Sequence, residues 1–267
     1  MTGSEFDRAA FAAADIHPWP DPAANGGAVP APVAVITGAS RGLGRELARS
    51  LARGGWRLVL TARGAADLDA TAAELAAFTR VAAIAGSVVD DEHRADLADA
   101  AAELGGTALL VNNASTLTGY DLDGEPMPAL ADFPLTGLLE TFEVNVLGPI
   151  ALTQLVLPQL RQSGGVIINV SSDAAAEPYA GWGGYGASKA ALDHASAILA
   201  EEEPALRVWS VDPGDMRTRM HQEAFPGEDI SDRPLPEAVV PAFLRLLRER
   251  PASGRYIATD LLAKAGV

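Results

Sequence analysis

The amino-acid sequence predicts an α/β fold over residues 33–267, with one doubly wound, mostly parallel sheet and helices on both of its faces. Three observations lead to this prediction. Short runs alternate with longer helical patterns, the short runs are almost continuously apolar, and no linker or internal repeat divides the segment. Apolar strands of this kind are typical of parallel sheets covered on both faces, and right-handed crossovers give the doubly wound arrangement.

Each element has its own signal. The predicted strands are apolar runs at residues 33–36, 57–61, 81–85, 108–111, 166–170, 208–211 and 256–258. The predicted helices run from the first glycine-rich turn to residue 53 and then over 67–78, 90–104, 136–163, 185–202 and 236–248. Gly54 and Gly55 end the first helix, because glycine readily adopts the left-handed angles of a helix C-terminus. Acidic residues open the helix at 90–104, where the helix dipole favours them.

Residues 1–32 differ in composition from the rest of the chain. A short helix is predicted at 6–14, and the prolines and glycines between residues 18 and 32 exclude regular structure. We therefore predict an Ala/Pro-rich N-terminal extension without a catalytic part, followed by one domain at 33–267.

Composition excludes several classes of protein. The 267 residues are 48% hydrophobic and contain no cysteine, which removes disulfides and thiolate metal sites. The formal net charge of −15 argues against nucleic acid as a partner, because its phosphates would be repelled. The histidines lack metal-ligand spacing, so no metal site is predicted.

We expect a cytoplasmic protein without a membrane segment. No apolar run reaches the ~20 residues that a membrane span requires. The longest helical candidate, at 136–163, contains Glu140, Glu143 and Asn145. The first residues show no basic leader followed by the apolar core of a signal peptide.

Gly38, Gly42 and Gly44 lie in the turn between the first predicted strand and the first helix, with the spacing GxxxGxG. Bare backbone can approach a pyrophosphate closely, and the N-terminus of the following helix favours its negative charge. Glycines also make ordinary turns, but their place after the first strand indicates a dinucleotide site of the Rossmann type.

The end of the second predicted strand indicates which dinucleotide is bound. An NAD site usually places an acidic residue there, which accepts hydrogen bonds from the ribose hydroxyls. Here Thr61, Ala62 and Arg63 occupy this stretch, and Arg63 together with Arg41 can clamp a 2′-phosphate. NADPH/NADP+ is therefore the expected cofactor, and two solvated arginines are the alternative interpretation.

Tyr185 and Lys189 form the candidate catalytic pair. Residues four apart share one face of a helix, where an ammonium group can stabilise a phenolate. With help from a cationic nicotinamide ring, the phenol pKa would move from about 10 toward ~7. Such a phenol can give a proton to a carbonyl oxygen near neutral pH. Most pairs at this spacing are ordinary helix surface, but Ser172 and Asn145 precede this one in the sequence and favour a catalytic role.

Together these motifs resemble the classical short-chain dehydrogenase/reductase family. The likeness spans nearly all of the chain from residue 33, and its motifs occur in the same order. They are residues 37–44, Asn112-Asn113-Ala114, Asn145, Ser172, Tyr185, Lys189 and Pro213-Gly214. The resemblance implies that Tyr185 donates the proton and that Ser172 binds the substrate carbonyl. It also implies that Lys189 tunes the tyrosine and holds the nicotinamide ribose, and that Asn145 orders a proton-relay water.

The resemblance also implies a set of cofactor contacts. These are Gly38, Ser40, Arg41, Gly42, Leu43, Gly44, Ala62, Arg63, Ser87, Val88, Asn113, Ala114, Tyr185, Lys189, Pro213, Gly214, Met216 and Thr218. Two positions depart from the family pattern. Ser115 stands where glycine is usual, and Ser87 where an acidic residue often contacts adenine. Since neither position is expected to touch the reacting atoms, we expect altered cofactor affinity rather than lost chemistry.

A narrower likeness, over residues 177–224, is to the sepiapterin reductases within this family. Their pterin is held by a carboxylate near the C-terminus, where this chain has Ala258, with Asp260 two positions on. A pterin is therefore less expected than a small ketone, dicarbonyl or aromatic carbonyl compound. The loops expected to form the substrate pocket contribute Tyr120, Tyr179, Trp182 and Met216.

The expected function is NADPH-dependent carbonyl reduction, with the hydride from NADPH and the proton from Tyr185. The alternatives are an alcohol dehydrogenase acting in the oxidative direction and a non-catalytic NADP-binding sensor, which would not need an acid matched to a base. Apolar residues surround much of the helix at 136–163. Since such a helix must be buried on several sides, a homodimer or homotetramer is expected.

Overall fold

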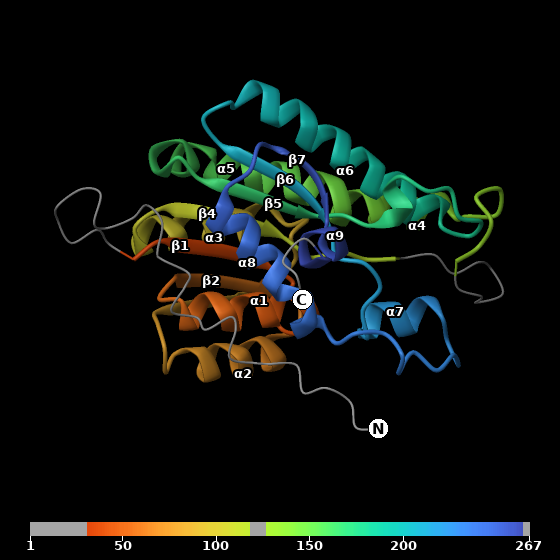
Figure 1. Ribbon diagram of the computed structural model, residues 1–267, viewed down its shortest axis with the longest axis horizontal. Coiled ribbons are helices and arrows are strands. Elements are labelled where there is room, and N and C mark those ends of the chain that lie inside the picture. Colours follow the sequence, from red (N-terminus) through yellow and green to blue (C-terminus); the bar gives the residue numbers. More distant parts are fainter. Residues whose placement is uncertain (1–30, 118–126, 264–267) are drawn as a thin grey trace.

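All strands of the sheet run parallel, in the order β3-β2-β1-β4-β5-β6-β7 (Figure 1). The computed structural model describes residues 31–117 and 127–263. The strands are β1 (Val33–Thr37), β2 (Arg57–Ala62), β3 (Val81–Ala85), β4 (Thr107–Asn112), β5 (Val166–Val170), β6 (Arg207–Asp212) and β7 (Gly254–Ile257). The predicted doubly wound fold is confirmed. The predicted extension at 1–32 lies outside the described residues except for its last two positions, and Tyr120 lies outside them as well.

Helices connect the strands and cover both faces of the sheet. They are α1 (Gly42–Arg53), α2 (Ala65–Leu75), α3 (Asp91–Leu104), α4 (Leu135–Phe142), α5 (Gly148–Ser163), α6 (Gly183–Glu202), α7 (Arg219–Ala224), α8 (Val240–Glu249) and α9 (Ala258–Ala263). Three short helical turns are the π-helical η3 (Glu143–Leu147) and the 3-10 turns η4 (Asp173–Ala175) and η5 (Pro236–Ala238).

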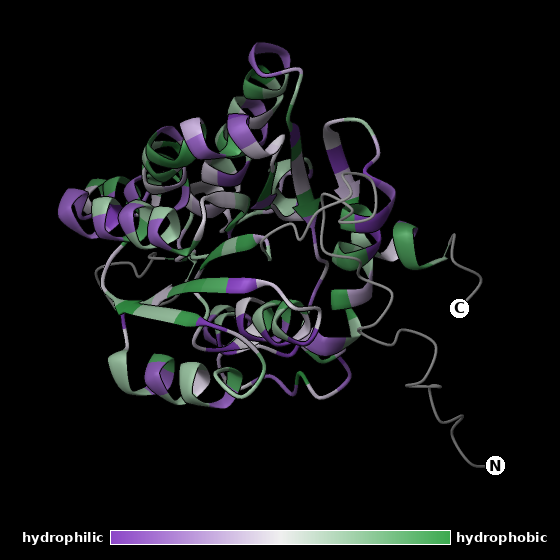
Figure 2. Ribbon diagram, turned by 90° about the vertical axis from the view of Figure 1, so that its left-hand side faces the viewer, coloured by the Kyte–Doolittle hydropathy of each residue, from purple (hydrophilic) through white to green (hydrophobic). Residues whose placement is uncertain are grey.

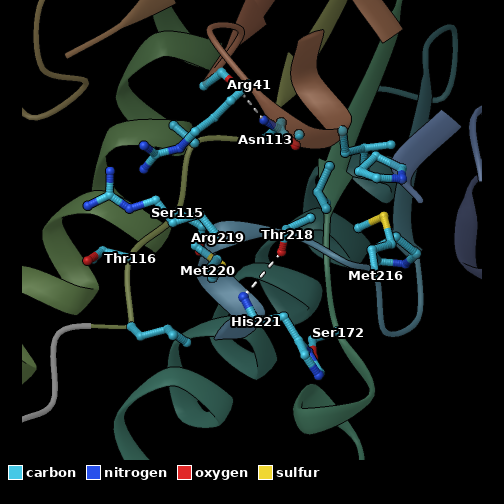
Figure 3. A pocket seen from close by; sticks show the side chains of 18 of the residues that line it. Arg41, Asn113, Ser115, Thr116, Ser172, Met216, Thr218, Arg219, Met220 and His221 are labelled. Carbon is cyan, nitrogen blue, oxygen red and sulfur yellow. Dashed lines mark hydrogen bonds between the residues drawn. The ribbon is translucent and has the colours of Figure 1, made fainter. Parts of the chain in front are cut away.

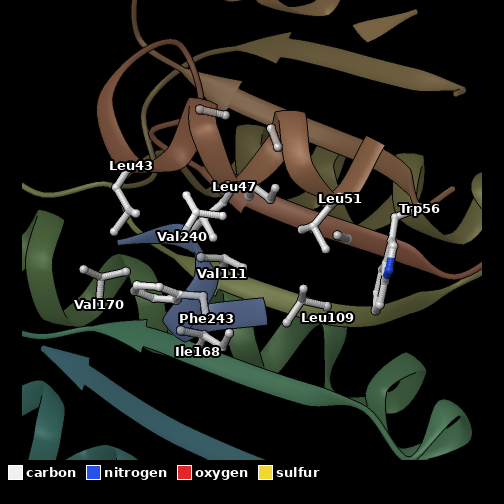
Figure 4. Close-up of a cluster of buried hydrophobic side chains, with 14 of the residues drawn as sticks. Leu43, Leu47, Leu51, Trp56, Leu109, Val111, Ile168, Val170, Val240 and Phe243 are labelled. Atoms are coloured by element: carbon white, nitrogen blue, oxygen red, sulfur yellow. The ribbon is translucent and has the colours of Figure 1, made fainter. Parts of the chain in front are cut away.

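The core has two layers, one on each face of the sheet. Helices α1, α2, α8 and α9 pack on one face, and α3, α5 and α6 pack on the other. In the first layer, Leu47 of α1 and Phe243 of α8 lie over Val111 and Ile168 of the central strands (Figure 4). The strands are predominantly hydrophobic along their length, whereas the helices mix hydrophobic and hydrophilic residues (Figure 2). This distribution explains why the strands appear in the sequence as apolar runs.

The sheet order reverses direction between β1 and β4. From β1 the chain proceeds outward through β2 and β3, and then returns to place β4 on the other side of β1. In doubly wound sheets, ligands bind in the crevice beyond the carboxyl ends of the strands at this switch point. The topology therefore directs the glycine turn after β1 and the segments after β4, β5 and β6 to one edge of the sheet.

Three predicted elements differ from the structure. The helix expected at 136–163 is α4, η3 and α5, because a π-helical turn interrupts the regular hydrogen bonding. Helix α7 lies in a stretch expected to be loop, where the Thr218 side chain caps a single short helix. The last strand ends at Ile257, and Ala258 begins α9 instead of ending the strand.

One helical stretch among the described residues, Leu135–Ser163, is long and apolar enough to cross a membrane by length and composition, with a mean hydropathy of 1.2. In this fold it covers β4 and packs against α3. Its buried residues Val146, Leu152 and Val156 face the protein interior. The stretch therefore serves as a covering helix of the sheet.

Candidate active site

A cleft of about 980 Å³ opens at the carboxyl ends of the strands. All the predicted catalytic and cofactor residues line it except Gly44 and Asn145. Arg41 and Asn113 lie on one side of the cleft and Ser172 on the opposite side, with Thr218 between them (Figure 3). The tertiary structure thus gathers residues from six connections into one site.

The glycine turn closes tightly against the end of β4. Gly38 has a φ of +66°, and a Cβ at Gly44 would lie 2.4 Å from the Gly38 carbonyl oxygen, so a side chain is excluded there. The Asn113 side chain donates hydrogen bonds to the carbonyl oxygens of Thr37 and Gly38, at 2.9 and 3.2 Å. Gly44 and Asn113 therefore fix the conformation of the glycine turn through its backbone carbonyl groups.

The N-terminus of α1 is open toward the cleft. It begins at Gly42, no side chain caps it, and its first turn contains no acidic residue. The first backbone N–H groups of a helix have no partner within the helix, and together with the helix dipole they bind phosphate. The turn consequently fits the pyrophosphate of a dinucleotide.

Arg41 and Arg63 are exposed arginines that line the same side of the cleft. Neither forms an ion pair with any residue in the described part of the chain. Their neighbours Arg45 and Arg49 both pair with Glu74, at 3.2 and 2.8 Å. Arg41 and Arg63 are therefore the guanidinium groups at this end that can receive a further phosphate.

The candidate catalytic pair, Tyr185 and Lys189, is buried on α6. Lys189 is only 2% exposed, its Nζ lies 5.5 Å from the centroid of the Tyr185 ring, and it donates a 2.7 Å hydrogen bond to the Val170 carbonyl oxygen. Burial lowers the pKa of Lys189 to about 8, and the Asp193 carboxylate acts in the opposite direction. The two side chains share a face of the helix, as the spacing predicts.

Burial also raises the pKa of Tyr185, while hydrogen bonding with the Ser172 and Ser115 hydroxyls lowers it. The lowered phenol pKa that is expected with the nicotinamide ring beside it stays a prediction. Desolvation of the phenolate is the largest cause of the raised pKa, and the Asp212 and Asp173 carboxylates act in the same direction. Ser115, which was expected to lie away from the reacting atoms, thus influences the pKa of the phenol.

Asn145 is buried in the π-helical turn η3 and is fully hydrogen-bonded. Its side-chain oxygen accepts from the Ser115 hydroxyl and the Thr116 N–H, and its amide donates to the Thr116 carbonyl oxygen and the Ser188 hydroxyl, at 2.9–3.0 Å. These four hydrogen bonds occupy both donor positions and both acceptor positions of the carboxamide. The side chain therefore holds the segment after β4 against α6, and the role of Asn145 in ordering a relay water stays a prediction.

Sequence reasoning missed Asp173, which follows Ser172 directly. The Ser172 hydroxyl donates to one Asp173 carboxylate oxygen and the Tyr179 hydroxyl to the other, each at 3.0 Å. An aspartate that opens a 3-10 turn is read from sequence as a local cap, so only the structure reveals that it holds the Ser172 hydroxyl. The Asp173 carboxylate thus accepts a hydrogen bond from the hydroxyl that is predicted to bind the substrate carbonyl.

Aromatic rings surround the substrate end of the cleft. The Trp182 ring lies 5.7 Å from that of Tyr185 in an edge-on arrangement and 5.9 Å from that of Phe225. His221 of α7 lies 5.0 Å from Phe225. The predicted pocket residues Tyr179, Trp182 and Met216 all line the cleft, whereas Phe225 had no signal in the sequence beyond being aromatic.

Two further sequence observations concern ligands. Ala258, at the position of the pterin-binding carboxylate, is buried in the core, and neither it nor Asp260 lines the cleft. No group of three His, Asp or Glu side chains placed to hold a metal ion occurs among the described residues. The site thus offers a dinucleotide groove, a buried tyrosine–lysine pair and an aromatic pocket.

A dinucleotide groove that meets a buried phenol and a serine hydroxyl defines an oxidoreductase acting on CH–OH or C=O groups. The family profile described as short chain dehydrogenase matches residues 32–229. The chain is 36% identical to a sepiapterin reductase of Xenopus laevis over 219 residues, 76% of this chain and 80% of the relative. It is 35% identical to a serine 3-dehydrogenase of Agrobacterium fabrum over 189 residues, covering 69% and 72%.

Solved structures show the same relationship. A short-chain dehydrogenase of Escherichia coli complexed with NADPH superposes with a TM-score of 0.77 at 29% identity, covering 85% of this chain and 96% of that one. The protein belongs to the classical short-chain dehydrogenase/reductase family, whose members use NAD(P).

Proposed function

We propose that this protein is an NADPH-dependent reductase of a small ketone, dicarbonyl or aromatic carbonyl compound. The observation that carries the proposal is the arrangement of Tyr185, Ser172 and Lys189 at one end of a cleft whose other end holds Arg41 and Arg63. The NADPH complex of the Escherichia coli neighbour and the reductase name of the Xenopus laevis relative support it.

Each catalytic side chain has a role that its position supports. When bound, NADPH supplies the hydride for the carbonyl carbon. Tyr185 gives its phenolic proton to the carbonyl oxygen, and the Ser172 hydroxyl turns from Asp173 to the same oxygen and stabilises the charge that develops there. The Lys189 ammonium offsets the negative charge left on Tyr185.

The pocket favours a planar substrate. Trp182 and Phe225 present ring surfaces beside the phenol, and aromatic partners stack or meet edge-on with a gain of about 0.5–1.5 kcal/mol per pair. The decisive experiment is a screen of aliphatic ketones, diketones and aryl ketones, monitored by NADPH absorbance. Turnover of aryl ketones and diketones supports the proposal, whereas NADPH binding without turnover of any carbonyl compound indicates the sensor.

Replacement of Arg63 by alanine is expected to weaken NADPH binding roughly 10- to 100-fold and to leave NADH binding nearly unchanged. A charged hydrogen bond contributes about 1.5–3 kcal/mol, and only NADPH carries the 2′-phosphate. Dissociation constants for both cofactors, measured by fluorescence, check this. Arg80→Ala is the control, since it removes one exposed arginine next to the amino end of β3. Equal losses for NADPH and NADH would exclude the 2′-phosphate role.

We also propose that the protein is a homo-oligomer that pairs through α4 and α5. Leu135 and Leu139 are 75% and 65% exposed, and Leu147 and Leu155 of the same helical stretch are also exposed. The sequence predicts a helix that is apolar around much of its circumference, but within one subunit only the side that faces the sheet is covered. The 21 residues from Leu135 to Leu155 span roughly 30 Å at ~1.5 Å per residue, long enough for a two-fold helix pair.

Leu139→Glu is expected to convert the oligomer to a monomer, because it places a charge in an apolar contact that two-fold symmetry makes twice. Light scattering coupled to size-exclusion chromatography at micromolar concentration measures the mass. Phe78→Glu, which changes an exposed apolar residue between α2 and β3, is the control and should leave the mass unchanged. A wild-type protein that is already monomeric would contradict the proposal.

A further inference from the structure

Arg255 of β7 connects three elements that carry the active site. Its Nη2 donates to the Ser172 carbonyl oxygen at 2.9 Å and to an Asp212 carboxylate oxygen at 3.2 Å, and its Nε donates to Asp193 at 3.1 Å. These acceptors belong to the segment after β5, the end of β6 and helix α6. One planar guanidinium group therefore fixes the spacing between them, as its forked donors allow.

The two carboxylates depend on this arginine. The Asp212 and Asp193 side chains are only 5% and 15% exposed, and their salt bridges among the described residues are both with Arg255. The Ser171 hydroxyl is the other side-chain donor to Asp193. A poorly solvated carboxylate without a cation is strongly unfavourable. Without Arg255, the two carboxylates would repel each other, and this repulsion would push the end of β6 away from α6.

Each contact lies directly beside a group that the proposed reaction needs. Asp193 is one helical turn beyond Lys189 on α6, and its charge raises the pKa of that lysine. Asp212 accepts a 2.9 Å hydrogen bond from the Gly214 N–H and so orders the turn at Pro213 and Gly214, which lines the cleft. The bond to the Ser172 backbone fixes the serine whose hydroxyl meets the substrate.

We propose that Arg255 is a positioning residue of the active site, which sets the distance between Ser172, the catalytic helix and the Gly214 turn. The inference rests on the proposed reductase function, but it concerns one half of the cleft only. No contact of Arg255 reaches the glycine turn, Arg41 or Arg63. Its loss should therefore damage the nicotinamide and substrate end and leave the adenosine end intact.

The test compares Arg255→Met and Arg255→Lys with the wild type. Lysine keeps the charge that neutralises the two acids, but its single ammonium cannot bond to all three acceptors in the guanidinium geometry. Arg245→Met is the matched control, because Arg245 is also a partly buried arginine that pairs with Glu249 and joins α8 to α9 away from the cleft. Three quantities are measured: kcat/KM for the best carbonyl substrate, the affinity for NADPH, and the affinity for 2′,5′-ADP, which fills only the adenosine end.

For Arg255→Met we expect kcat/KM to fall about 10²-fold, as misplacement of reacting groups by about 1 Å can cause. NADPH should bind several-fold more weakly and 2′,5′-ADP as in the wild type. Arg255→Lys should keep the melting temperature of the wild type and still lose about 10-fold in kcat. Arg245→Met should change stability without changing kcat/KM.

Two results would overturn the inference. One is wild-type kcat/KM and NADPH affinity in both Arg255 variants. The other is an equal loss of NADPH and 2′,5′-ADP affinity, which indicates general damage. If the wild type reduces no carbonyl compound, the reductase proposal fails by itself. The positioning role is then decided by whether Arg255→Met weakens NADPH but not 2′,5′-ADP.

Discussion

Replacement of Tyr185 by phenylalanine is expected to lower carbonyl reduction by at least about 10²–10⁴-fold, the contribution that a positioned general acid makes. The substitution removes one oxygen and keeps the ring, which meets Trp182 edge-on at 5.7 Å. Folding and NADPH affinity should therefore change little, the latter by no more than a few-fold. Steady-state kinetics and cofactor fluorescence separate the two effects.

The matched control is Tyr256→Phe. Tyr256 of β7 also loses a hydroxyl that is hydrogen-bonded, to the Ala252 carbonyl oxygen at 2.7 Å, but it does not line the cleft. Its activity should stay close to that of the wild type. A Tyr185→Phe variant that reduces carbonyl compounds at the wild-type rate would remove Tyr185 from the mechanism.

Replacement of Lys189 by methionine is expected to reduce activity by at least about 10²-fold and also to weaken NADPH binding. The ammonium group lies 5.5 Å from the Tyr185 ring and is the buried cation beside the phenol. Without it, the negative charge left on Tyr185 after proton transfer has no counter-charge, and the nicotinamide ribose loses its expected partner. The combined loss distinguishes Lys189→Met from Tyr185→Phe.

Although Lys189→Met is expected to lose activity, its folding stability should not fall. The pKa of Lys189 falls from 10.5 to about 8 on folding, which corresponds to roughly 3 kcal/mol of unfavourable burial of the charged form at pH 7. The lost hydrogen bond to Val170 offsets about 1–3 kcal/mol of this gain. The variant should therefore be at least as stable as the wild type at pH 7.

The pH dependence gives the sign of this effect. Between pH ~8 and 10.5 the unfolded chain binds the proton of Lys189 more strongly than the folded protein does, so wild-type stability rises with pH relative to the variant. Urea unfolding of both proteins at pH 7 and pH 10 measures the difference. A variant that is several kcal/mol less stable at pH 7 would show that the buried ammonium stabilises the fold.

The sequence by itself determined the fold class and most of the site. Parallel strands in a sheet covered on both faces are apolar for most of their length, so the buried β5 and the partly buried edge strand β3 were predicted with their observed bounds. Gly44 was identifiable from the GxxxGxG spacing after the first strand, although the close approach of the Gly38 carbonyl oxygen to it appears only in the structure. The Tyr185/Lys189 pair was identifiable because helical periodicity alone places both side chains on one face. These features depend on local geometry, which short stretches of sequence encode.

Only the tertiary structure decided the partners and charge states of these groups. Burial raises the pKa of Tyr185, and burial is a property of everything packed around the phenol rather than of its helix. Asn145 is held in place because Ser115, Thr116 and Ser188 converge on its side chain from two other segments. Arg255 meets acceptors 43, 62 and 83 positions away in the chain. Contacts between residues so distant in the chain leave no periodic signal, because only the folding of the sheet brings their strands together.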